Sequence, residues 1–284
     1  MTYTLRHILP ALLVLTLAPA VAAQQRPLLT EDPETVGADR MLVEAGFDYV
    51  RDARFTVSGL EGHLLRVPTI GLSIGAGSAA EFQIDGALYQ RLTITDRFAA
   101  PLAGVVTATG NSTYSIDDVV IGAKVRFVSE GASRPSFGMR FATKLPNASN
   151  ESGLGLDTTD FVSAFIVGKT VRSVRVVGNV GLGIFPDPIR GDRQNDMVVY
   201  GLSFARAITN GAEVVGEVNG RLDTRSGDPF PGTESRSTAR FGARYTLGGW
   251  RGDVGLLVGL TSADPSFGMT AGFTYVFGSF LKAP

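Results

Sequence analysis

Apolar and polar residues alternate along most of the chain after residue 40. In the run 41–49, for example, Met41 and Phe47 fall on one face and Glu44 falls on the other. Successive side chains of a β-strand point to opposite faces, so runs of about ten alternating residues are typical of strands with one apolar and one polar face. Such runs span 41–49, 80–89, 119–127, 137–145, 174–184, 198–207, 212–222, 239–247, 250–260 and 267–277, and two weaker runs, whose faces the sequence does not assign, span 70–75 and 161–170.

The connections between these runs are alternately long and short. The long ones span 51–65, 91–113, 147–158, 186–195, 224–234 and 261–266, and the short ones span 76–79, 130–134, 171–173, 208–211 and 247–250. A transmembrane barrel has short periplasmic turns and longer external loops, whereas a soluble sandwich has no reason to place its long loops at one end. We therefore expect an all-β protein, a transmembrane up-and-down antiparallel β-barrel of about 12 strands over residues 40–279. Both termini should lie in the periplasm, and the last strand should pair with the first because lipid tolerates no open edge.

The first residues predict export. Residues 1–7 carry the charge of Arg6, residues 8–21 are almost continuously apolar, and Ala20–Ala23 supplies the small residues that a signal peptidase reads. This pattern is typical of a removable signal peptide, which we assign to residues 1–23, and it favours the outer membrane as the location. A retained membrane anchor is the less favoured alternative, because the apolar run is short and contains two prolines.

Residues 24–39 form a polar segment before the first strand, in which Pro27 and Pro33 oppose strand extension. We expect this N-terminal segment to stay on the periplasmic side or to tuck into the mouth of the barrel. A disordered tail is the alternative. At the other end, residues 280–284 form a short tail after the last strand.

The composition suits a large exported β-domain. The chain has no cysteine, 35 glycines, a net charge of −1 and a pI of about 6.2, a balance that argues against a nucleic-acid partner. Aromatic residues on the predicted apolar faces gather near the short turns, as in the interfacial girdle of a membrane barrel, although aromatics favour any strand. They are Phe82, Phe127, Phe137, Tyr245, Trp250, Tyr275 and Phe277.

The residues offer little for catalysis or metal binding. His63, expected in the first long loop, has no serine at a spacing suited to a Ser–His pair. Two groups of acidic residues could offer oxygen ligands to Ca²⁺, but their spacing matches no defined cation loop. These groups are Asp187, Asp192 and Asp196, and Asp223, Asp228 and Glu234. We expect no enzymatic activity, no metal and no cofactor.

Charged residues on the polar faces are expected to line the lumen. They are Glu44, Asp48, Glu81 and Asp85 on early strands, Lys124, Arg126, Arg140, Lys144 and Arg175 on the following ones, and Glu213, Glu217, Arg240 and Arg244 later. Buried charges must be paired or hydrated, so they form either a salt-bridged plug or an aqueous path. A barrel of eight strands is filled by its side chains and one of sixteen or more encloses an open channel, so twelve strands predict a narrow channel.

Four of these basic residues should form one positive patch that favours anions. They are Lys124, Arg126, Arg140 and Lys144, which lie on strands adjacent in sequence and therefore adjacent in an up-and-down barrel. The competing interpretation is that the four are locked in ion pairs and the barrel is closed.

Three segments resemble a known family. They are 26–37, 117–127, and 144–149 followed by 158–161. Together they are similar to the outer-membrane transporters named for the MetA pathway of phenol degradation. The resemblance implies an outer-membrane channel for small aromatic or other hydrophobic compounds, and it brings no catalytic residues.

The sequence thus favours a protein of the cell outer membrane that passes small molecules passively, with membrane lipid and a small solute as its partners. A closed structural or adhesive barrel is the main alternative. A lipid-modifying barrel enzyme is less favoured, because a Ser–His pair is missing from the sequence pattern.

Overall fold

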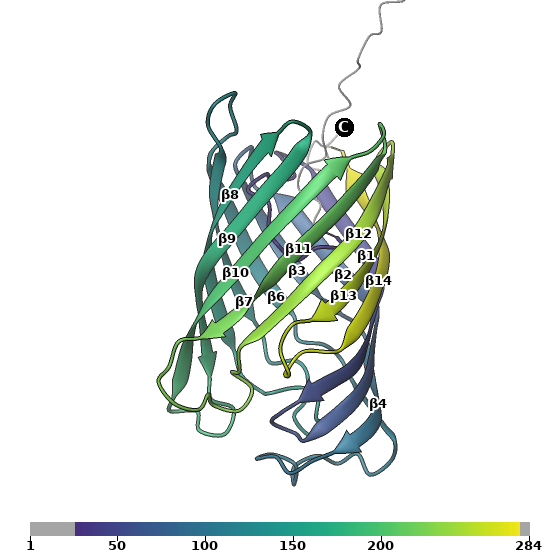
Figure 1. The fold of residues 1–284 in the computed structure, drawn as a ribbon, viewed down its shortest axis with the longest axis vertical. Coiled ribbons are helices and arrows are strands. Elements are labelled where there is room, and N and C mark those ends of the chain that lie inside the picture. The colour runs from purple at the N-terminus through teal and green to yellow at the C-terminus, as the bar shows by residue number, and fades with distance from the viewer. Residues whose placement is uncertain (1–25, 279–284) are drawn as a thin grey trace, which may run out of the picture.

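The alternating runs form β-strands in the computed structural model, which describes residues 26–278 (Figure 1). The expected signal peptide and the tail at 280–284 lie outside the described residues. The strands are β1 (Met41–Phe55), β2 (Leu60–Gly75), β3 (Ala80–Ala87), β4 (Gln90–Arg97), β5 (Ser112–Ser115), β6 (Val120–Val128), β7 (Ser136–Lys144), β8 (Asp160–Val171), β9 (Val174–Pro186), β10 (Gln194–Ala207), β11 (Ala212–Asp223), β12 (Arg236–Leu247), β13 (Trp250–Gly259) and β14 (Phe267–Phe277). Among residues 26–278, no helix has the length and the hydropathy to span a bilayer.

Twelve of these strands close into an antiparallel barrel. The ring runs β1, β2, β3, β6 and β7, then in chain order to β14, which pairs again with β1 (Figure 1). The closing pair is in register from Met41 opposite Phe277 to Arg51 opposite Phe267. Each strand of the ring therefore has a hydrogen-bonded neighbour on both sides, as hydrocarbon requires. The predicted twelve-strand barrel is confirmed.

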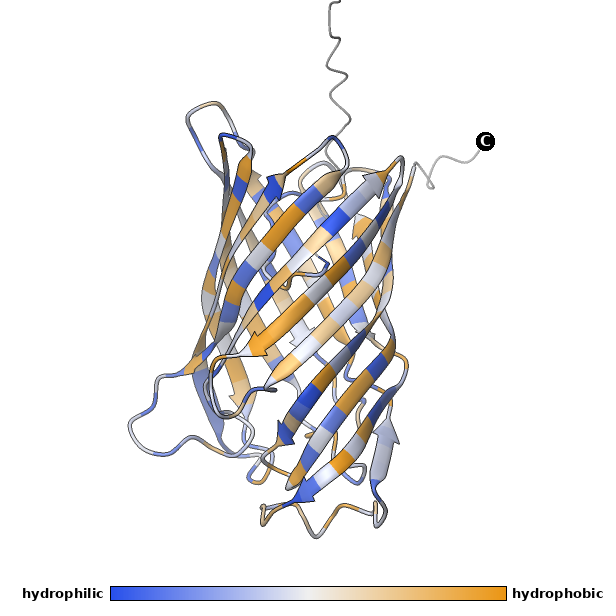
Figure 2. Ribbon diagram, turned by 45° about the vertical axis from the view of Figure 1, so that its right-hand side comes forward, coloured by the Kyte–Doolittle hydropathy of each residue, from blue (hydrophilic) through white to orange (hydrophobic). Residues whose placement is uncertain are grey.

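The outer face of the barrel is apolar. Phe82 is 58% exposed and Trp250 54%, although both are large hydrophobic side chains, and the alternation of colours along the strands in Figure 2 shows the pattern. In the weaker run at 161–170, Phe161 and Phe165 are exposed, which assigns that face as the outer one. A water-soluble protein would bury such residues, so this surface suits contact with lipid.

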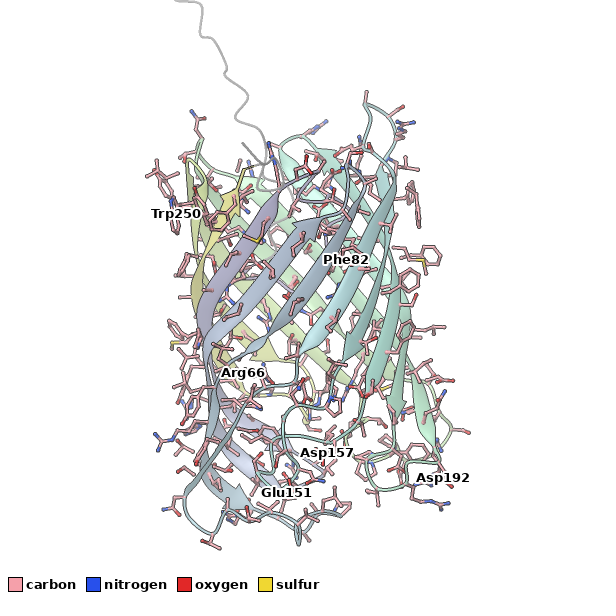
Figure 3. All side chains as sticks on the ribbon, turned by 180° about the vertical axis from the view of Figure 1, so that it is seen from behind. Arg66, Phe82, Glu151, Asp157, Asp192 and Trp250 are labelled. Carbon is pink, nitrogen blue, oxygen red and sulfur yellow. The ribbon has the colours of Figure 1, made fainter. Side chains whose placement is uncertain are left out.

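Aromatic rings gather at the end of the barrel that carries the short turns. The ring centroids of Trp250 and Tyr275 lie 4.4 Å apart, and those of Tyr275 and Phe277 lie 4.6 Å apart. Figure 3 shows Trp250 at this end and Glu151, Asp157 and Asp192 at the opposite, long-loop end. The long and short connections therefore lie at opposite ends, as the sequence predicts.

One side of the barrel extends beyond the rest, which the sequence pattern did not predict. Residues 51–65, expected as a loop, belong mostly to β1 and β2, and the expected loop 91–113 includes most of β4 and the first half of β5. The outer half of β2 pairs with β4, and His63 lies opposite Thr93 in this pairing rather than in a loop. The extension therefore continues the sheet of the barrel, which β4 and β5 join through β2.

The polarity of this extension is the reverse of that in the barrel wall. Leu60, Leu64 and Leu92 are buried on its inner side together with Ala53 and Leu154, whereas Arg91 and Thr93 face out. An apolar inside and a polar outside suit a sheet that projects into water. The sequence pattern predicts loops here because the apolar residues of these strands face inward, whereas those of the barrel wall face outward.

Candidate functional site: the lumen and its N-terminal plug

The segment before the first strand lies inside the barrel. Arg26 donates hydrogen bonds to Thr69 on β2 and Thr270 on β14. Ten residues later, the backbone N–H of Val36 donates to Glu81 on β3 at 2.7 Å. We call residues 26–39 the plug segment. Its contacts reach strands on several sides of the ring, so the segment crosses the lumen.

Glu217 on β11 holds the backbone at the middle of the plug segment. Its carboxylate accepts from the N–H of Leu29 at 2.9 Å and from the N–H of Thr30 at 2.8 Å. Asn179 on β9 then makes a pair of bonds with the backbone of Glu31, accepting from its N–H and donating to its carbonyl, both at 2.8 Å. Side chains of the wall thus satisfy a stretch of backbone that joins no strand.

A buried ion-pair cluster fixes the side chain of Glu31. Lys124 on β6 has an exposed fraction of 0%, and its ammonium lies 3.2 Å from the carboxylate of Glu31 and 3.0 Å from that of Glu81. Arg140 on β7 approaches the same Glu31 at 2.9 Å. A buried charge is tolerated only when it is paired, so Lys124 depends on both carboxylates.

A third anchor lies toward the short-turn end. Arg175 on β9 contacts Asp32 at 2.6 Å and Glu130 at 2.6 Å. Partial burial alone would raise the pKa of Glu130, but hydrogen bonds from the Thr170 backbone N–H, Lys169 and the Thr170 hydroxyl, with the Arg175 charge, hold that pKa below its usual range. Glu130 therefore stays ionised and keeps Arg175 in place.

Glycines in the wall make room for the plug segment. A Cβ built on Gly255 of β13 would lie 2.9 Å from the Cβ of Pro27. A Cβ built on Gly201 of β10 would lie 2.7 Å from the Thr30 hydroxyl oxygen. Both distances are shorter than real Cβ contacts allow, so the segment fits against the wall only because these positions lack side chains.

The expected lumen charges all have partners in the structure. Arg126 pairs with Glu34, Lys144 with Asp118 and Asp160, Asp85 with Arg140, Asp48 with Arg26, Arg240 with Glu217, and Glu213 with Arg244 and Arg251, while Glu44 accepts from Thr274. The basic group at Lys124, Arg126, Arg140 and Lys144 is accordingly not an unpaired patch in this state. Three of its members pair with carboxylates of the plug segment.

The partners that the sequence reasoning missed are Glu31, Asp32 and Glu34 of the plug segment. The sequence offered a signal for them, because these acidic residues lie close together beside two prolines, ahead of strands rich in inward basic residues. It also offered small residues at inward positions of the wall. Neither signal says which acid meets which base, since those pairs are more than 90 residues apart in sequence.

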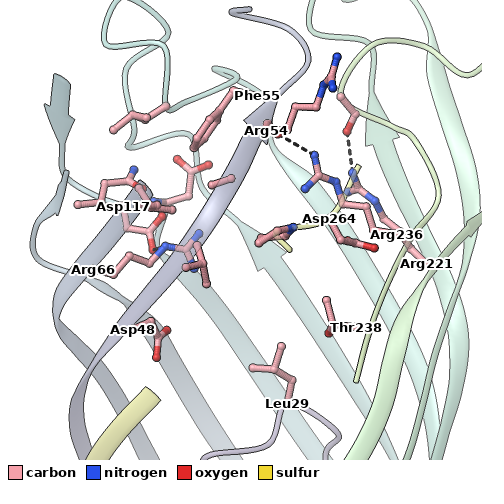
Figure 4. A pocket seen from close by; sticks show the side chains of 18 of the residues that line it. Leu29, Asp48, Arg54, Phe55, Arg66, Asp117, Arg221, Arg236, Thr238 and Asp264 are labelled. Carbon is pink, nitrogen blue, oxygen red and sulfur yellow. Dashed lines mark hydrogen bonds and ion pairs between the residues drawn. The ribbon is translucent and has the colours of Figure 1, made fainter. Parts of the chain in front are cut away.

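A cavity of about 730 Å³ lies between the plug segment and the long-loop end (Figure 4). Leu29 of the plug segment lies at its inner end, and Arg54 and Phe55 of β1 lie at its outer end. Apolar lining residues include Val50, Leu64, Leu154 and Leu257. The cavity therefore offers space of mixed polarity that the plug segment closes off on the inner side.

The acidic residues that were considered as calcium ligands serve the loops instead. Asp187 accepts from the N–H groups of Ile189 and Arg190 and pairs with Arg193. Asp223 accepts from Asn195 at 3.0 Å. In the part of the chain that the structure describes, no cluster of three or more His, Cys, Asp or Glu side chains is placed to hold a metal ion.

Comparison with known proteins identifies the fold. No family model matches the chain, and no curated protein matches it. The structure is similar to an outer membrane channel from Pseudomonas putida F1, at 12% identity over 87% of this chain and 98% of that one, with a TM-score of 0.60. It is also similar to the NanC porin, at 8% identity over 83% of this chain and 98% of that one, with a TM-score of 0.52. With its closed wall and apolar outer face, the protein is an outer-membrane β-barrel.

Proposed function

We propose that the protein is a passive channel for small molecules and that the plug segment closes it at rest. The observation that carries this proposal is the construction of the plug. Its backbone is held by side chains of the wall, such as Glu217 and Asn179, and takes no part in the hydrogen-bonded ring of strands. The segment can therefore leave the lumen while the barrel remains closed against lipid.

Release of the plug segment would also change the charge of the path. Lys124, Arg126, Arg140 and Arg175 would lose the carboxylates of Glu31, Asp32 and Glu34 and would face water that entered the lumen. A positive wall in a narrow, low-dielectric pore raises the local concentration of anions. The open state should therefore favour anions, although the closed state has no unpaired basic patch.

The nature of the solute is supported by the sequence and by the cavity. The segments at 26–37 and 117–127 resemble the family of transporters named for the MetA pathway of phenol degradation, which implies small aromatic or hydrophobic compounds. A cavity of about 730 Å³ has the size of a small-molecule site. Its apolar lining residues suit the body of such a compound.

The proposal is tested by recording conductance in planar bilayers from the full chain and from a variant that lacks residues 26–38. The variant should conduct more strongly, and its reversal potential in a salt gradient should indicate anion preference. A second variant, Glu31→Gln with Asp32→Asn and Glu34→Gln, keeps the length of the segment and should show the same change in weaker form. Absence of conductance in all three proteins would contradict the channel and would favour a closed structural or adhesive barrel, whereas equal, measurable conductance in all three would contradict the closing role of the plug segment.

A further inference from the structure

Two arginines lie side by side on neighbouring strands in the wall of the 730 Å³ cavity, which we call the outer cavity. Arg221 on β11 and Arg236 on β12 are opposite partners in the strand register, and both line the cavity (Figure 4). Like charges directly opposite each other destabilise a pair of strands. The arrangement therefore needs a reason beyond the stability of the sheet.

Neither arginine forms an ion pair within the described residues. Arg221 donates to the carbonyls of Gly232 at 2.8 Å and Glu234 at 3.1 Å. Arg236 donates to the carbonyl of Arg54 at 3.1 Å, and its Nε is buried with no hydrogen-bond partner. Neutral carbonyl groups orient the two guanidinium groups, and the carboxylates of Glu234, Asp160 and Asp264 act on Arg221 only from beyond ion-pair distance.

The three carboxylates that act on Arg221 from a distance make their contacts with other groups. Asp264 accepts from the N–H of Ser237 at 2.9 Å and from the hydroxyl of Thr261 at 2.7 Å. Glu234 accepts from the N–H of Gly232 at 2.9 Å, and Asp160 pairs with Lys144 at 3.2 Å. These contacts orient the three carboxylates toward other groups, so a further anion would not have to displace an ion pair from either arginine.

Apolar groups lie beside the two charges. The guanidinium of Arg221 lies over the ring of Phe185, 4.8 Å from its centroid. Val57 and Leu156 line the same cavity, and both lie against Gly232, whose carbonyl accepts from Arg221. A ligand that placed an anionic group between the arginines would therefore bring its body against apolar side chains.

We propose that Arg221 and Arg236 form a binding site for the carboxylate of a small, largely apolar acid that enters from the long-loop end. A carboxylate matches the fork of a guanidinium and can accept from both arginines at once. Its negative charge would also reduce the repulsion between the two strands. This inference rests on the proposed channel, to which it assigns a class of solute.

Calorimetric titration of the purified full chain with benzoate tests the site, with benzyl alcohol as an uncharged probe of similar shape. Arg221→Gln with Arg236→Gln should raise the dissociation constant for benzoate at least tenfold and leave that for benzyl alcohol unchanged. Arg236→Lys keeps the charge but loses the planar fork, so its dissociation constant should lie between those of the wild type and the double variant. Arg190→Gln, a matched loss of charge on an exposed loop at the same end, should have no effect.

The inference is wrong if the wild type does not bind benzoate, or if the double variant binds it as tightly as the wild type does. Heat-dependent gel migration shows whether each variant is a folded barrel, and Arg236→Lys gives a second comparison if the double variant does not fold. Conductance of the variant without residues 26–38 separates the two claims. If that variant conducts but benzoate binding does not depend on the two arginines, only the binding site is refuted. If benzoate binding depends on the arginines but no variant conducts, only the channel is refuted.

Discussion

Removal of the charge on Glu217 should release the plug segment. In Glu217→Gln the side chain keeps its size, but one oxygen becomes an amide nitrogen that cannot accept a hydrogen bond. The backbone N–H groups of Leu29 and Thr30, which both point at this carboxylate, then lose a charged acceptor. The ring of strands is not directly affected, because none of its backbone hydrogen bonds involves this side chain.

The size of the effect follows from the two donors. A hydrogen bond to a charged group contributes about 1.5 kcal/mol or more to stability. The glutamine carbonyl can still accept one of the two bonds as a neutral hydrogen bond, so the loss is about 2 kcal/mol, and because 1.4 kcal/mol is about tenfold, the population of released plug segment should rise by about 30-fold.

Cysteine labelling measures this release directly. The chain has no cysteine, and Thr30 is buried with its hydroxyl unpaired, so Thr30→Cys places one protected thiol on the plug segment without removing a hydrogen bond. The rate of its reaction with a maleimide should follow the released population. The rate should be about 30-fold higher with Glu217→Gln, by the same estimate.

Glu213→Gln is the matched control for this measurement. Glu213 lies on the same strand and the same inner face, but its carboxylate pairs with Arg244 and Arg251 of the wall. The Glu213→Gln variant should therefore leave the labelling rate of the plug segment unchanged. If Glu217→Gln labels no faster than Glu213→Gln, the carboxylate of Glu217 does not hold the plug segment and the reasoning fails.

Three further changes test the packing and the charges of the lumen. Lys124→Met leaves the buried carboxylate of Glu81 without a cation and Glu31 with Arg140 alone, so it should lower the free energy of unfolding by about 3–5 kcal/mol in denaturant titrations, a loss that Glu81→Gln should partly reverse. Gly255→Ala pushes against Pro27 and should speed labelling of the plug segment about tenfold, since overpacking costs about 1–3 kcal/mol, whereas Gly252→Ala, with open space around its Cβ, should not. Glu130 has a lowered pKa, so its stabilising contribution is present above the ordinary pKa of glutamate and is lost as the pH falls through the lowered value. The stability difference between the wild type and Glu130→Gln should therefore shrink in acid, and a constant difference would exclude this role.

The barrel itself could be predicted from local pattern. A strand in contact with lipid on one side and polar groups on the other must alternate, and runs such as 267–277 do so over their whole length. Closure then follows from the cost of open edges in lipid. The extension formed by β4 and β5 was missed because its apolar residues, such as Leu92, face inward, which reverses the pattern.

The candidate site could be predicted only in part. The sequence assigned the charges to the polar faces of the strands, and it predicted that residues 24–39 would stay near the periplasm or tuck into the barrel mouth. It could not pair Glu31 with Lys124, or Asp32 with Arg175, because such contacts depend on how the chain returns through the lumen. The opposed arginines at the outer cavity likewise depend on strand register, which alternation alone does not fix.

A reversible crosslink between the plug segment and the wall tests the central claim most directly. A Cβ built on Gly201 would lie 3.4 Å from the Cβ of Thr30, close to the spacing of about 3.5–4.5 Å found in disulfides. In the double variant Thr30→Cys with Gly201→Cys, oxidation should fix the segment in the lumen and reduce solute flux into liposomes to background. Reduction of the same sample should restore the flux, and equal flux before and after reduction would contradict the claim that the plug segment must leave for solutes to pass.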